Sequence, residues 1–135
     1  FTASFSDFDS MMNFVRSSLE KAEGLEQNTN QFEVAVEEAL VNVIKYAYKP
    51  PEGIIEIECG LKVEDKCFMV KIVDSGAPFN PLSSKGLISP VSLESQDLGG
   101  LGIHFIKKMS DSVDYEYVND RNVLVLTKKV TLLGS

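Results

Sequence analysis

Two amphipathic helices are predicted in the first third of the chain. Over residues 10–22 the apolar side chains recur every three or four positions, as they do on one face of a helix, and Gly24 ends the segment. A second helix is expected over residues 30–48. Its buried stripe consists of Phe32, Val36, Ala39, Leu40, Val43 and Ala47. Apolar residues alternate over residues 1–5, which predicts a short strand before the first helix.

Four further strands are predicted as two hairpins. Residues 55–62 alternate between apolar and charged side chains, whereas residues 67–73 are more uniformly apolar and are therefore expected at the centre of the sheet. The short connection between these two strands predicts an antiparallel pair. A second hairpin is expected over residues 113–126, with its turn at residues 119–122.

The segment between the two hairpins has no sustained periodicity over residues 78–98, where Pro, Ser and Gly recur. A loop of this length in a compact domain is usually functional, and we expect it to form a mobile lid. A short helix is predicted after Gly102, ending near Ser110. The order of the elements predicts an α+β sandwich, in which a mostly antiparallel sheet carries its helices on one face.

Length and charge narrow the class of protein. The 135 residues, of which 44% are apolar, suffice for a single domain over residues 1–135. The net charge of −7 argues against general DNA or RNA binding, because such binding relies on Lys and Arg. Neither a signal segment nor a membrane span is expected. Cys59 and Cys67 could face each other across a hairpin, but two unpaired thiols in a cytoplasmic protein are the simpler interpretation.

Glu38 and Asn42 place a carboxylate and an amide four residues apart, on one face of the second predicted helix. Such a pair can hold a hydrated Mg2+ and activate a hydroxyl group beside it. An ordinary solvent-facing pair is the alternative. We favour the metal site because Glu33 and Glu37 already provide a polar face, whereas Glu38 and Asn42 lie near the edge of the buried stripe.

Two turns add the remaining parts of a nucleotide site. Asp74 ends the expected central strand just before Gly76, so that a carboxylate lies at the edge of the sheet where a flat ring can approach. Residues 99–102 form a glycine-rich turn before a helix, an arrangement that presents free N–H groups to phosphate. Each turn alone could be an ordinary one. Their occurrence in this order after Glu38 and Asn42 predicts an ATP site.

The three segments resemble the sequence boxes of the GHKL superfamily of histidine kinase-like ATP-binding domains. Residues 38–42 are similar to its N box, residues 74–78 to its first glycine box and residues 98–102 to its second. Longer matches over residues 37–48 and 74–81 resemble the anti-sigma-factor serine protein kinases of bacteria. The resemblance covers almost the whole chain, and it implies a Bergerat-type two-layer sandwich with an ATP lid.

The resemblance also implies roles for the matching residues. Asn42 would coordinate Mg2+, and Glu38 would act as the general base. Asp74 would accept a hydrogen bond from the adenine amine, with support from Thr127 on the last strand. The glycine of the first box would line the adenine ring, and those of the second would hold the phosphates. The residues expected to contact the nucleotide are Asn42, Asp74, Gly76, Pro78, Lys85, Gly99, Gly100, Leu101, Gly102 and Thr127.

Three positions depart from the pattern of these kinases. Tyr46 stands where His is frequent, and Asn80 replaces a common Asp. Arg121 and Asn122 stand where many relatives have Gly-Thr before the last strand. These differences bear on substrate geometry more than on ATP binding.

The implied function is an ATP-dependent serine kinase that phosphorylates a STAS-type anti-anti-sigma protein and sequesters a sigma factor, with ATP and Mg2+ as cofactors. Retention of Glu38 favours this enzyme. A nucleotide-gated binding module with slow or absent transfer is the alternative, which Tyr46 and Arg121 leave open. A histidine kinase is disfavoured, because no upstream dimerisation helices with a phosphoacceptor are recognised. Direct binding to nucleic acid or a membrane is not expected, and a homodimer is left open.

Overall fold

The computed structural model describes residues 1–21, 30–46, 53–62, 64, 66–78 and 106–130. The helical elements are a 3-10 turn η1 (Phe5–Asp7), α1 (Phe8–Lys21) and α2 (Asn30–Tyr46). The strands are β1 (Ile55–Lys62), β2 (Cys67–Asp74), β3 (Ser112–Val118) and β4 (Arg121–Lys129). Residues 106–109 are helical as well, and the remainder of the predicted short helix lies outside the described residues.

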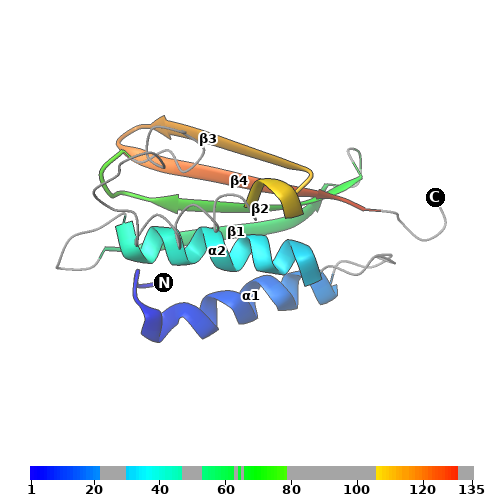
Figure 1. Ribbon diagram of the computed structural model, residues 1–135, viewed down its shortest axis with the longest axis horizontal. Coiled ribbons are helices and arrows are strands. Elements are labelled where there is room, and N and C mark those ends of the chain that lie inside the picture. The colour runs from blue at the N-terminus through cyan, green and yellow to red at the C-terminus, as the bar shows by residue number, and fades with distance from the viewer. Residues whose placement is uncertain (22–29, 47–52, 63, 65, 79–105, 131–135) are drawn as a thin grey trace.

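The four strands form one sheet in the order β1-β2-β4-β3, in which every pair is antiparallel. Figure 1 shows two layers, with α1 and α2 on the same side of the sheet. The predicted hairpins and the central place of the apolar strand β2 are therefore confirmed, as is the α+β sandwich. The expected lid falls almost entirely outside the described residues.

The core lies between the sheet and the two helices. The inward-facing residues of β2 and β4 alternate along each strand, as expected for a sheet with one buried face. Those residues are Phe68, Val70, Ile72, Leu124 and Leu126. Helix α2 packs on this face through Phe32, whose ring meets that of Phe68 edge-on with a centroid distance of 6.2 Å.

The free thiols Cys59 and Cys67 do not form a disulfide. Cys59 pairs in register with Val70, and Cys67 pairs with Lys62, so the two cysteines are not opposite each other. Burial raises the pKa of the Cys59 thiol to about 11. The simpler interpretation from the sequence, two unpaired thiols, is confirmed.

The predicted strand over residues 1–5 is reduced to a single bridge between Thr2 and Ile54. After Ala3, whose N–H donates to the carbonyl of Gly53, the chain turns away from the sheet, and the Asp7 carboxylate accepts a hydrogen bond from the Thr2 N–H at 2.8 Å. A turn of 3-10 helix follows at η1. The alternation of apolar residues therefore predicted a longer strand than the one that forms, since the chain enters the helical turn directly after Ser4.

The turn between β3 and β4 is shorter than predicted. Val118 and Arg121 are paired, so only Asn119 and Asp120 connect the strands. Both have positive φ, at 53° and 60°, as a two-residue hairpin turn of this hand requires. Asn122, which was expected in the turn, is consequently a strand residue whose side chain faces the core.

Truncation of Phe32 tests the contact between α2 and the sheet. Phe32→Ala removes a fully buried ring, and we expect a loss of about 3–5 kcal/mol in the free energy of unfolding. Phe5→Ala is the matched control, because that side chain is 57% exposed; its effect should stay within about 0.5 kcal/mol. Urea denaturation followed by circular dichroism measures both. Equal effects would contradict the assignment of Phe32 to the core.

Candidate functional site

Asp74 occupies the last position of β2 and is buried on the inner face of the sheet, with 5% of its surface exposed. Its Oδ1 accepts a hydrogen bond from the Gly76 N–H at 2.9 Å. This closes the turn that follows the strand, in the way typical of Asp before a glycine turn. The carboxylate is thus bound to the backbone of the turn two residues further along the chain.

Asn122 lies directly opposite Asp74 in the pairing of β2 with β4, and it is 4% exposed. Its Nδ2 donates to Asp74 Oδ1 at 2.9 Å and to the carbonyl of Ala77 at 2.9 Å, with the carbonyl of Gly76 at 3.4 Å. On its other side, the amide oxygen accepts a hydrogen bond from the Tyr115 hydroxyl on β3. Asn122 therefore ties the end of β2 and the turn after it to β4 and β3.

These bonds leave the two oxygens of Asp74 in different states. Oδ1 accepts both hydrogen bonds, from Gly76 and Asn122. Oδ2 accepts none from the residues that the structure describes. An open oxygen on a largely buried carboxylate is suited to an N–H donor from a ligand, and hydrogen bonds to a charged group are stronger than neutral ones.

The amide of Asn42 is buried on α2, with 6% exposed. Its Nδ2 donates to the backbone carbonyl of Glu38 at 3.0 Å. The interaction across one helical turn is therefore between side chain and backbone, and Oδ1 of Asn42 accepts no hydrogen bond within the described part of the chain. An amide oxygen in this state can serve a cation.

Glu38 differs from the two other acidic residues near it on α2. Glu33 and Glu37 both pair with Arg16 of α1, with N–O distances of 3.4 and 3.0 Å. The half-buried Glu38 carboxylate has no ion pair or hydrogen bond with any described residue. Two carboxylates of the helix thus pair with α1, and the third has no partner in the part of the chain that the structure describes.

The two halves of the site lie at the same end of the molecule. Phe32 near the start of α2 meets Phe68 near the start of β2, and Figure 1 shows the helix and the strand running in the same direction. Asn42 is about 15 Å along the helix from Phe32. Asp74 is about 20 Å along the strand from Phe68. The ends that carry the candidate chemistry are therefore brought together.

Thr127 does not support Asp74. It pairs with Met69, about 17 Å along β4 from Asn122, and its side chain is on the outer face of the sheet. Its hydroxyl instead forms a hydrogen bond with that of Ser112 on β3. The prediction for Thr127 is wrong because a residue an odd number of positions from Asn122 faces the opposite side of a strand.

Of the other predicted site residues, Gly76 and Pro78 belong to the turn after Asp74, and Pro78 is exposed. Lys85, Gly99, Gly100, Leu101 and Gly102 lie outside the described residues. Tyr46 ends α2 and is 42% exposed.

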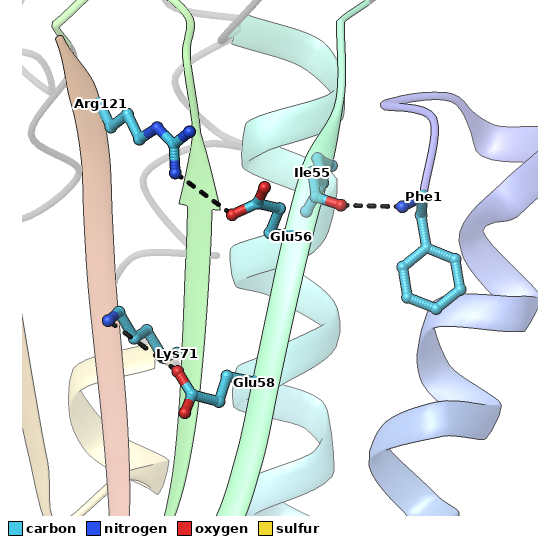
Figure 2. A network of polar contacts seen from close by, with 6 residues as sticks. All are labelled: Phe1, Ile55, Glu56, Glu58, Lys71 and Arg121. Atoms are coloured by element: carbon cyan, nitrogen blue, oxygen red, sulfur yellow. Dashed lines mark hydrogen bonds and ion pairs between the residues drawn. The ribbon is translucent and has the colours of Figure 1, made fainter.

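Arg121 points to the outer face of the sheet, away from Asp74. Its guanidinium reaches across β2 to Glu56 on β1, at 3.4 Å, and Lys71 pairs with Glu58 at 3.9 Å (Figure 2). These residues line an open groove of about 640 Å³ on that face. The groove is on the far side of the sheet from Asp74 and Asn122, and its charged side chains are already paired.

Sequence reasoning missed Asn122 and Tyr115 as site residues. The available signal was the departure from Gly-Thr at positions 121–122, which was interpreted as a change in substrate geometry. The strand register was needed to show that Asn122 lies opposite Asp74.

Within the described residues, no group of three His, Cys, Asp or Glu side chains could hold a metal ion, and no helix is long and apolar enough to cross a membrane.

Comparison with known proteins gives a consistent result. The sequence profile described as "Histidine kinase-like ATPase domain" matches residues 1–128. The serine-protein kinase RsbW of Bacillus mycoides is 31% identical over 100 residues, which cover 71% of this chain and 60% of that protein. RsbW of Listeria monocytogenes is 36% identical over 101 residues, covering 71% of this chain and 62% of that one. The chain thus spans about three fifths of these relatives.

Two solved structures share the fold. The histidine kinase domain of the blue-light-activated kinase EL346 from Erythrobacter litoralis has a TM-score of 0.54 and 10% identity, covering 74% of this chain and 43% of that one. The histidine kinase AdeS from Acinetobacter baumannii has a TM-score of 0.52 and 13% identity, covering 99% and 68%. At these identities the likeness concerns the fold alone.

Proposed function

Because the chain belongs to the family of histidine kinase-like ATPase domains, which implies ATP binding, we propose that it is an ATP-dependent serine protein kinase and anti-sigma factor. It phosphorylates a small STAS-type anti-anti-sigma protein and sequesters a sigma factor. The relatives named serine-protein kinases, at 31% and 36% identity, support the choice of serine as the acceptor. The STAS partner and the sigma factor rest on the resemblance to anti-sigma kinases.

The observation that carries the proposal is the state of Asp74. One oxygen is consumed by Gly76 and Asn122, and the other accepts nothing from the described residues, at the buried end of β2. This arrangement suits the exocyclic amine of adenine, a flat group with an N–H donor in its plane. In the proposal Asp74 recognises the base, with Gly76 beside the ring.

The helix side of the site supplies the groups for phosphoryl transfer. Among the described residues, the amide oxygen of Asn42 accepts no hydrogen bond, and the carboxylate of Glu38, one helical turn away, has no partner. Mg2+ usually takes only one or two protein ligands and fills the rest of its shell with water and phosphate oxygens, so a single amide is compatible with it. The ion would neutralise charge on the phosphates. Glu38 would orient the serine hydroxyl and accept its proton.

The phosphates themselves would be held by the glycine turn over residues 99–102, with Lys85 adding positive charge. Phosphoryl transfer requires alignment and charge neutralisation more than covalent participation of the protein. The proposal therefore assigns the reaction to few residues, of which Glu38 alone takes part in proton transfer.

Nucleotide binding is the first prediction. Because a ligand that binds only the folded state stabilises it, Mg-ADP at a hundredfold excess over its dissociation constant should add about 2.7 kcal/mol to the free energy of unfolding. A thermal melt with and without millimolar Mg-ADP or Mg-ATP measures this. An unchanged melting temperature with both nucleotides would refute the proposed function.

Asp74→Asn tests base recognition. The substitution keeps the shape of the side chain but replaces a charged acceptor, and we expect adenine nucleotide affinity to fall by about 1.5–3 kcal/mol. Asp114→Asn is the matched control, because that exposed carboxylate on β3 makes the same change of charge away from the site. Calorimetric titration with ADP compares the two. Parental affinity in a folded Asp74→Asn variant would reduce Asp74 to a turn residue.

Glu38→Gln separates the kinase from a nucleotide-gated binding module. A general base acts on the nucleophile, so the variant should bind Mg-ATP as the parent does and lose roughly 10²- to 10⁴-fold in transfer rate. Glu37→Gln is the control, since that carboxylate pairs with Arg16. Intact mass measurement of a STAS partner after incubation with Mg-ATP follows the reaction. Transfer at an unchanged rate excludes Glu38 as base, and a parent that binds STAS partners without ever phosphorylating them is the module.

A further inference from the structure

Asn122 has no donor left for a ligand. Its two amide hydrogens face three acceptors, namely Asp74 Oδ1 and the carbonyls of Ala77 and Gly76. These contacts also fix which end of the amide is nitrogen, because a carboxylate and two carbonyls surround one end while a hydroxyl donates to the other. The side chain therefore acts on the site through its neighbours.

The Tyr115 hydroxyl completes this arrangement from the next strand. It donates to Asn122 Oδ1, while its ring packs against the hydrophobic core. The bond opposes rotation of the amide about its last torsion, so the nitrogen stays directed at Asp74. Three strands, β2, β4 and β3, thus contribute one residue each to a connected chain of hydrogen bonds.

We propose that Asn122, held by Tyr115, is a positioning residue that saturates Oδ1 of Asp74 and leaves Oδ2 as the acceptor for the 6-amino group of a purine, so that it sets the preference for adenine. The inference rests on the proposed function, in which this site binds an adenine nucleotide. Without the amide, the Gly76 N–H is the one donor among the described residues that still holds the carboxylate, and a single donor can bind either oxygen after rotation. The Gly76–Ala77 turn also loses its tie to β4.

The test compares two ligands that differ only in the 6-amino group, ADP and the diphosphate of purine riboside. Calorimetric titrations are made with the parent chain and with Asn122→Val and Asn122→Thr. Val and Thr have the same shape, but only Thr keeps a hydroxyl that can donate to Asp74. Circular dichroism and a thermal melt establish that each variant is folded.

We expect the parent to prefer ADP by about tenfold or more, since the amine donates to a charged group. In Asn122→Val this preference should fall to within about twofold, and in Asn122→Thr most of it should remain. A variant Asn122→Val that weakens both ligands by the same factor, or neither, would overturn the inference and show a structural role only. A parent that binds neither ligand would refute the proposed function itself, which is a different result.

Tyr115→Phe gives a second measurement if Asn122→Val does not fold. It removes only the hydroxyl, and the preference for ADP should fall several-fold. Tyr117→Phe is the matched control, because Tyr117 lies two residues along β3 and is 41% exposed; its preference should equal that of the parent. An unchanged preference in Tyr115→Phe would overturn the part assigned to the pair.

Discussion

The antiparallel pairing of β2 with β4 is the contact on which the other features of the domain depend. It joins two hairpins that are far apart in the sequence, and it places β2 and β4 at the centre of the sheet. The same register sets Ile72 against Leu124 in the core and Asp74 against Asn122 at the end. Packing and site geometry therefore follow from one alignment of two strands.

This register also divides the functions of adjacent residues between the two faces of the sheet. Asp74 and Asn122 face the helices, whereas their neighbours Val73 and Arg121 line the outer groove. A shift of one residue in β4 would exchange its two sets of side chains and bury Arg121. The apolar residues that precede Asp74 on β2 therefore keep Asp74 on the inner face. A strand turned over would expose these residues to water and lose their packing in the core.

The sequence was a good guide to whatever depends on periodicity or on a short local pattern. Both long helices, both hairpins and the central position of β2 were predicted from such patterns, and Asp74 was recognised as the end of that strand. The errors arose where a short pattern is cut off or where the register decides. The first strand gives way to the helical turn after Ser4, and Thr127, expected to support Asp74, lies on the outer face of the sheet.

An amide at position 122 can do what a hydroxyl there cannot. A Thr side chain has one hydrogen to donate, so it can satisfy the carboxylate or a turn carbonyl but not both. Asn has two, and it donates to Asp74 and to Ala77 with equal distances of 2.9 Å. The longer side chain needs a partner for its oxygen in a buried place, since an unsatisfied buried acceptor is costly. Tyr115 is that partner, so the two residues are best understood as one unit.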